Sequence, residues 1–198
     1  MFQTTSLNQS AISFSNHLFL NRFAWTHAAK VWLYMLIVFG HFSEHAIQIY
    51  QIYGLGWIPK EAGGILGLWF PGLAQAEVLH LAYNSFQLAG LLILLSGFVG
   101  GARLWWKAAI VAQSWHYIEH YLLQVQWITG IYLFGATEQM SIGQLFLPRA
   151  ELHFIYNFVV FVPTIIGTIL YFHQKQNTFT IKNSPFAIQL NLLLTKII

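Results

Sequence analysis

The chain has 198 residues, a length that suits one domain. Apolar residues make up 57% of the sequence and charged residues 8%, against about 25% charged residues in a typical soluble domain, which argues against a soluble fold. The absence of cysteine excludes disulfides, thiolate catalysis and iron–sulfur clusters. The net charge of +3 is scattered without a basic run, so nucleic acid is not an expected partner.

The first expected transmembrane helix covers residues 31–53, close to the ~20 residues that a bilayer core requires. It carries the pattern His-x-x-Glu-His, written HxxEH, at positions 41–45, and a stretch with glycines and a proline ends it. The preceding residues 1–23 lack the basic start and compact apolar run of a cleavable signal. We therefore expect them to stay in the protein as an interfacial or cytoplasmic segment.

The second expected helix covers residues 73–99. It carries Glu77 and then the pattern His-x-x-Tyr-Asn, written HxxYN, at positions 80–84. Three closely spaced glycines at its end predict a tight turn into the third helix.

The third and fourth expected helices cover residues 104–133 and 151–172. The third repeats HxxEH at positions 116–120, and the fourth, which starts just after a proline, repeats HxxYN at positions 153–157. Residues 173–198 are expected to form a cytoplasmic or interfacial tail.

The basic residues predict the orientation of the chain in the membrane. Only Lys60 and Arg149 fall in the first and third loops. The two termini and the middle loop hold the others, which are Arg22, Lys30, Arg103, Lys107, Lys175, Lys182 and Lys196. Because cytoplasmic segments are enriched in Lys and Arg, we predict a multi-pass protein with both termini in the cytoplasm.

The sequence contains an internal repeat, with units at 31–99 and 104–172 inside a domain at 24–172. Each unit has HxxEH, a loop with a proline, and HxxYN, so the rarest residue types are the ones that recur. Two spans per unit make both units enter the membrane in the same direction. We therefore predict an all-α integral membrane protein, a four-transmembrane-helix bundle built from two parallel pseudo-twofold helix-hairpin repeats.

The repeated motifs place ionisable side chains on shared helix faces and at similar depths, because positions i, i+3 and i+4 project together. Ionisable groups inside a membrane are costly and need partners, so we predict one metal site rather than separate packing residues. The predicted ligands are His41, Glu44, His45, Glu77, His80, His116, Glu119, His120 and His153. The remaining histidines match no repeat element and are interpreted as interfacial: His17, His27 and His173.

The glutamates receive different interpretations. Glu44 and Glu119 occupy equivalent, deep places in both units, so we expect them to bridge two metal ions and to act as the catalytic carboxylates. Glu77 ranks below them, and Glu151 is interpreted as structural because a helix dipole stabilises a carboxylate near an N-terminus. Four side chains are expected to orient the ligands from a second layer: Asn84, Asn157, Tyr83 and Tyr156.

The ligand types favour a particular chemistry. Imidazole and carboxylate without sulfur suit iron, and also zinc, manganese or copper. Carboxylate-bridged two-metal sites in helical bundles use the Glu-x-x-His spacing that Glu77 and His80 have. We therefore predict a dinuclear centre, with iron favoured, in an oxidoreductase of the hydroxylase or desaturase kind. Its expected partners are the bilayer and a lipophilic small-molecule substrate, and self-association is left open. The HxxxH and HxxHH boxes of membrane desaturases are missing.

Three alternatives stay open from the sequence. HxxEH is similar to the motif of inverted zinc peptidases, which would make the chain an intramembrane zinc hydrolase. Haem or another tetrapyrrole held between histidines would make it an electron-transfer protein, although three polar groups on one helical turn suit haem poorly. A metal transporter would use the Glu and His residues as a relay, but no polar path is evident in the cytoplasmic half.

Overall fold

The computed structural model describes residues 4–74 and 76–182, with side chains described for 26–72 and 76–177. The described ranges are mostly helical and contain no strand. The elements in chain order are α1 (Thr4–Tyr53), α2 (Gly64–Trp69), α3 (Pro71–Ala74), α4 (Glu77–Leu94), η1 (Leu95–Gly97), α5 (Gly100–Thr129), η2 (Leu133–Gly135), η3 (Gly143–Leu145) and α6 (Arg149–Lys182).

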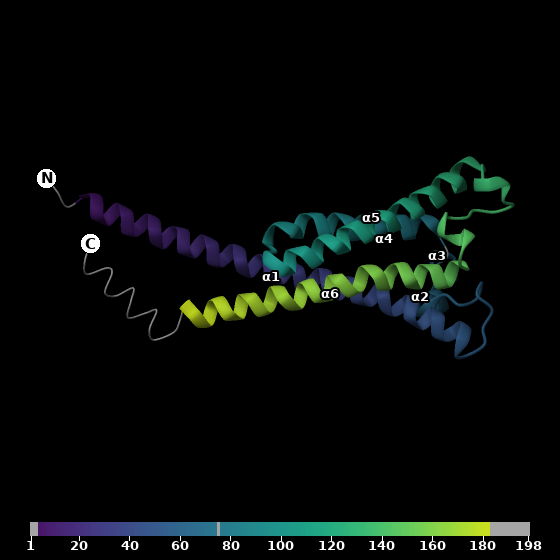
Figure 1. The fold of residues 1–198 in the computed structure, drawn as a ribbon, viewed down its shortest axis with the longest axis horizontal. Helices are drawn as coiled ribbons and strands as arrows, with labels where there is room; N and C mark the ends of the chain where they lie inside the picture. The colour runs from purple at the N-terminus through teal and green to yellow at the C-terminus, as the bar shows by residue number, and fades with distance from the viewer. Residues whose placement is uncertain (1–3, 75, 183–198) are drawn as a thin grey trace.

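Four long helices form the body of the molecule (Figure 1). Helix α5 packs against both α4 and α6, and α1 packs mainly against α6. The short elements α2, α3, η2 and η3 gather at one end of the body, and the start of α1 and the end of α6 extend from the other. The connections that follow the two HxxEH helices therefore lie at the same end.

Helix α1 is longer than the predicted span. It begins at Thr4, so residues 4–23 continue the helix rather than form the separate segment expected over 1–23. The physical reason is that no glycine or proline precedes Gly40, so nothing in the sequence breaks the helix. Helix α6 likewise runs to Lys182, into the expected tail, and the rest of that tail lies outside the described residues.

The other helix boundaries follow local breakers. The second long helix begins at Glu77 rather than at residue 73, because Pro71 starts the separate short helix α3. Helix α5 ends at Thr129, before Gly130, whose φ of 67° is the left-handed conformation typical of the residue after a helix C-terminus. Helix α6 begins at Arg149, directly after Pro148.

Two helices of the described part are long and apolar enough to cross a membrane, namely α4 with η1 (Glu77–Gly97) and most of α6 (Arg149–Asn177). Helices α1 and α5 are also long, but each carries an HxxEH motif and several glutamines, which lower its mean hydropathy.

Polar residues lie inside the body and apolar residues lie on its surface. On α5, His116 and Glu119 are buried. On the same helix, Trp115 and Ile118 are exposed. The apolar core, around residues such as Val31, lies towards the end of the body from which the start of α1 and the end of α6 extend.

His27, interpreted from the sequence as interfacial, packs inside the bundle beside this apolar core. Its side chain is buried, with Nε2 3.0 Å from the carbonyl oxygen of Leu94 and Nδ1 3.0 Å from the hydroxyl of Tyr171. The physical reason is that α1 starts before residue 27 and carries this side chain into contact with α4 and α6. His173 is exposed, and the side chain of His17 lies outside the described residues.

Candidate metal centre

The two HxxEH motifs place their histidines at the same Nε2–Nε2 separation. In each, the two histidines lie one helical turn apart on one face, as the i, i+4 spacing requires. On α1, Nε2 of His45 lies 3.1 Å from Nε2 of His41. On α5, Nε2 of His120 lies 3.1 Å from Nε2 of His116.

The first turns of α4 and α6 bring two more histidines to these pairs. Nε2 of His153 lies 2.8 Å from Nε2 of His120. The ring of His80 stacks against those of His120 and His153, with centroids 5.5 Å and 5.6 Å away, and the rings of His45 and His153 also stack at 5.6 Å. The structure thus brings together all six predicted histidines, which we call the histidine cluster: His41, His45, His80, His116, His120 and His153.

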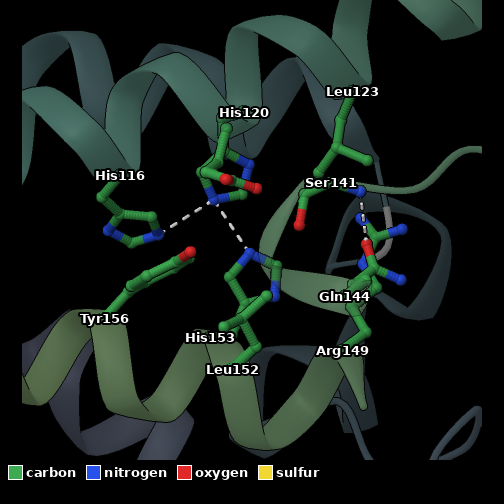
Figure 2. Close-up of a pocket in the computed structure, with 10 residues that line it drawn as sticks. His116, His120, Leu123, Ser141, Gln144, Arg149, Leu152, His153 and Tyr156 are labelled. Carbon is green, nitrogen blue, oxygen red and sulfur yellow. Dashed lines mark hydrogen bonds between the residues drawn. The ribbon is translucent and has the colours of Figure 1, made fainter. Parts of the chain in front are cut away.

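Three members of the histidine cluster could hold a metal ion (Figure 2). His116, His120 and His153 each offer one nitrogen, and these atoms lie within 4.8 Å of one another, the one such group in the described ranges. Metal–nitrogen bonds of ~2.0–2.1 Å place neighbouring ligand nitrogens roughly 3.0–3.4 Å apart. Two of the three observed separations, 2.8 Å and 3.1 Å, are close to that, and the third is at most 4.8 Å. We call this group the trihistidine site.

A small cavity adjoins the trihistidine site. It is lined by the three histidines together with Glu119, Tyr156 and residues of the third loop, and it has room for about one water molecule. Glu119 is buried, and its Oε2 accepts a hydrogen bond from the backbone N–H of Gly143 at 3.4 Å. Its Oε1 has no hydrogen-bond partner, which leaves one carboxylate oxygen free at the cavity.

Glu44 has a comparable loop contact in the first half of the chain. Its Oε2 accepts a hydrogen bond from the backbone N–H of Leu66 at 3.1 Å. Both predicted bridging glutamates therefore hold the loop that follows their helix. Of the two, Glu119 is the one that lines the cavity beside the trihistidine site.

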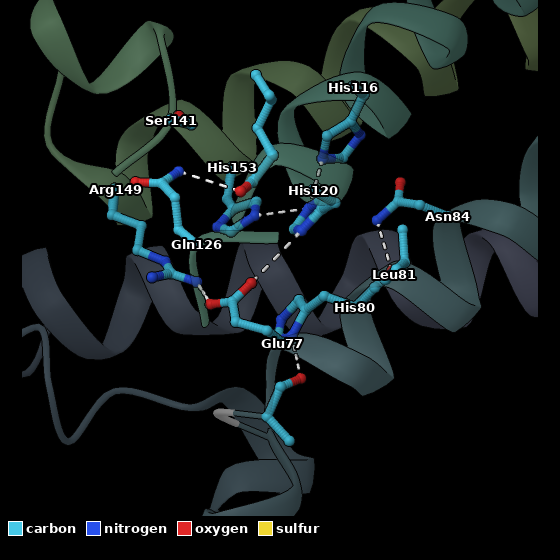
Figure 3. Close-up of polar contacts among 12 residues, drawn as sticks. Glu77, His80, Leu81, Asn84, His116, His120, Gln126, Ser141, Arg149 and His153 are labelled. Atoms are coloured by element: carbon cyan, nitrogen blue, oxygen red, sulfur yellow. Dashed lines mark hydrogen bonds and ion pairs between the residues drawn. The ribbon is translucent and has the colours of Figure 1, made fainter. Parts of the chain in front are cut away.

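Glu77 and Glu151 have partners that the sequence did not predict. One oxygen of Glu77 forms an ion pair with Arg149, and the other lies 3.9 Å from Nδ1 of His120, the ring nitrogen that faces away from the trihistidine site (Figure 3). Glu151 accepts a hydrogen bond from the hydroxyl of Tyr53 on α1. Glu151 thus joins two helices at their outer ends and lies apart from the histidine cluster.

The four side chains expected in a second layer act in two ways. The ring of Tyr83 stacks on His41 at a centroid distance of 3.5 Å, and the ring of Tyr156 lies 5.2 Å from that of His116. The two asparagines instead contact the backbone: the amides of Asn84 and Asn157 donate to the carbonyl oxygens of His80 and His153, at 2.8 Å and 2.9 Å. They support the helix that carries each histidine and do not contact the imidazole rings.

Two glutamines hold the first and third loops as an equivalent pair that the repeat comparison did not include. Gln51 exchanges two hydrogen bonds with the backbone of Gly64, at 2.9 Å and 3.1 Å. Gln126 does the same with Met140, at 2.8 Å and 3.3 Å. Each glutamine lies six positions after the second histidine of its HxxEH motif, so extending the repeat comparison along the helix would have found them.

Comparisons of the chain with protein-family models, curated proteins and solved structures give no match. The interpretation of the site therefore rests on its geometry. That geometry is a buried group of close histidines that could hold a metal ion, with a free carboxylate oxygen beside it.

Proposed function

We propose that the chain is a membrane metalloprotein whose metal centre is held by the histidine cluster. The observation that carries the proposal is the approach of Nε2 of His120 to Nε2 of both His116 and His153. Histidine is the commonest protein ligand for transition metals, and three histidine nitrogens directed at one point form the ligand set of many metal sites.

We propose that all four long helices span the membrane, with the termini in the cytoplasm. The support is the surface of the two less apolar helices. On α1, Trp32, Leu36 and Phe39 are exposed, and α5 exposes Val111 and Trp115. Soluble proteins rarely expose apolar surface on this scale, whereas lipid accommodates it. Polar side chains that lower the hydropathy of these helices face inwards, as expected where they serve a site.

We propose that the two halves are structural repeats. The support is that contacts, and not only letters, recur in both. The distance between the paired HxxEH histidines is 3.1 Å in each half. Gln51 and Gln126 hold the backbone of the following loops in the same two-bond manner. The asparagine of each HxxYN motif donates to the carbonyl of its own histidine.

We propose that the centre holds two metal ions, because one ion leaves half of the cluster without a role. The trihistidine site would hold the first ion, with the free oxygen of Glu119 beside it. His41, His45 and His80 would hold the second ion, with His41 and His45 contributing Nε2 atoms that lie 3.1 Å apart. Histidine with carboxylate suits iron, and zinc, manganese or copper are compatible with it.

For the reaction, we propose oxidation of a lipophilic substrate that reaches the centre from the bilayer. In a hydroxylation, one oxygen atom of O2 enters a C–H bond and the other leaves as water, taking two electrons and two protons from an external donor. A pair of iron ions held by the histidine cluster would supply the redox chemistry. The chain supplies the imidazole ligands, a dry helical surrounding, and in Glu119 a buried oxygen able to hold a proton at the cavity.

One observation favours a second candidate, metal-dependent hydrolysis. Three histidines beside room for one water are the ligand set of a catalytic zinc ion, which keeps its fourth position open. Glu119, which lines the cavity, would be the general base that takes a proton from this water. The haem alternative is less well supported, because the imidazoles of His80, His120 and His153 stack on one another, with centroids 4.7–5.6 Å apart.

The test is the metal content of detergent-purified protein, measured by elemental analysis. The wild type is expected to hold about two ions per chain, with iron indicating oxidation and a single zinc indicating hydrolysis. His116→Ala and His153→Ala are expected to lose at least one ion, as is Glu119→Gln. The matched controls are His173→Ala and Glu151→Gln, whose side chains lie away from the cluster. Metal-free wild type, or ligand variants that match their controls, would refute the proposal.

A further inference from the structure

We infer that Glu77, held by Arg149, is a positioning residue that makes the two metal positions unequal, so that the trihistidine site binds its ion first. The inference rests on the proposed metal centre and assigns Glu77 a role other than the ligand role expected from the sequence. The atom that matters is Nδ1 of the second HxxEH histidine, the ring nitrogen that is not directed at the proposed ion.

The two halves differ in the residue that faces Nδ1 of the second HxxEH histidine. In the first half, Nδ1 of His45 lies 3.3 Å from the amide oxygen of Gln48. In the second half, the equivalent Nδ1 of His120 faces a carboxylate, Oε2 of Glu77, at 3.9 Å. The position equivalent to Gln48 in the second half is Leu123. One half therefore provides a neutral amide where the other provides a charged carboxylate.

Both atoms of the Glu77–His120 contact lack another partner. Oε2 of Glu77 and Nδ1 of His120 are buried, and neither has a hydrogen bond. A shift of under ~1 Å would bring the 3.9 Å separation to hydrogen-bond length. Each atom would then be the hydrogen-bond partner that the other lacks. The remaining oxygen of Glu77 is fixed by Arg149, which neutralises a carboxylate that would otherwise be unpaired in the interior (Figure 3).

The contact determines where the proton of His120 resides. With the proton on Nδ1, donated to Glu77, the lone pair of Nε2 points at His116 and His153. A carboxylate partner also strengthens imidazole as a ligand more than an amide does, because its charge stabilises the N–H bond that it accepts. The histidines of the other side have weaker partners, namely Gln48 for His45 and the carbonyl oxygen of Ala76 for His80.

The test is titration of chelator-stripped, detergent-purified protein with Co2+, followed by its visible absorption. Co2+ reports both affinity and ligand set, because its absorption bands change when a ligand is lost. Wild type is expected to bind in two steps. Glu77→Gln should weaken the first step by about 10- to 100-fold while leaving the shape of the bands unchanged. His120→Ala should change the bands themselves, and Gln48→Ala, the matched control, should weaken only the second step.

Arg149 provides an independent check that does not require replacing a buried carboxylate. Arg149 is partly exposed, so Arg149→Gln is expected to fold even if Glu77→Gln does not. It should weaken the first step as Glu77→Gln does, and Arg149→Lys should restore most of the affinity. The Glu77→Gln, Arg149→Gln double variant should lose no more than the worse single variant, because both act through one contact.

The possible outcomes separate this inference from the proposed function. If wild type binds no Co2+, the metal centre itself is wrong. If wild type binds while Glu77→Gln or Arg149→Gln keeps the first step unchanged, the centre stands and the positioning role is wrong. If Glu77→Gln changes the bands as His120→Ala does, Glu77 is a ligand and the inference is overturned.

Discussion

Replacing Gln126 by methionine should weaken the attachment of the third loop to α5. Methionine keeps the length of the side chain but removes its amide. Three hydrogen bonds to the loop are lost: Nε2 to the carbonyl of Met140 at 2.8 Å, and the N–H groups of Met140 and Leu133 to Oε1 at 3.3 Å and 3.0 Å. At a net value of about 0.5–1.5 kcal/mol each, the loss amounts to about 2–4 kcal/mol of unfolding free energy.

The assay is reversible unfolding in mixed detergent micelles, followed by helical circular dichroism. The expected loss corresponds to a roughly 30- to 700-fold larger unfolding constant. Gln139→Met is the matched control, because Gln139 lies in the same loop and takes no part in this attachment. Gln51→Met, which loses two bonds to Gly64, should show a smaller loss of about 1–3 kcal/mol. A Gln126→Met protein within ~0.5 kcal/mol of its control would show that other contacts hold the loop.

Four further variants test the structure in the same unfolding assay. Gly56→Ala and Gly64→Ala share a left-handed backbone, at φ values of 73° and 69°, which costs roughly 1–2 kcal/mol for alanine. Gly64→Ala should cost about 1–3 kcal/mol more, because its Cβ would meet the carboxylate of Glu44, whereas the Cβ at Gly56 meets open space. His27→Ala should lower stability by roughly 2–4 kcal/mol yet leave metal content at the wild-type level; a loss of metal would place His27 in the site. Tyr83→Phe should be neutral or stabilising by up to ~1 kcal/mol, since the buried hydroxyl that it removes has no partner; a clear loss would reveal one.

The repeat is the feature of the sequence that predicted most of the candidate site. Rare residues at fixed helical spacing identify which side chains share a face, and the six histidines that share these faces come together in the structure. The loops were predicted from glycine and proline, which limit helices through backbone conformation alone. Gln126 follows the same logic and could have been found by it.

What the sequence did not reveal depends on contacts across the body. Arg149 and Glu77 stand far apart in the chain, and no periodicity relates them, so their ion pair arises only when the starts of α4 and α6 meet. His27 lies outside the repeat and was assigned to an interface for that reason, but the uninterrupted α1 carries it into the core. Both cases concern a single residue whose partner is set by packing.

If the histidine cluster holds the proposed metal centre, its short separations between nitrogens would link the supply of metal to the survival of the protein. Each neutral imidazole carries one N–H, so Nε2 atoms 2.8 Å and 3.1 Å apart require either tautomers in which one ring donates to the next or a cation shared between the lone pairs. A bound ion therefore stabilises the folded bundle over every looser form, by an amount that grows with the logarithm of free metal concentration. In a cell short of metal, newly inserted chains would be the first to open and meet membrane proteases, so the steady-state amount of this protein should follow metal availability.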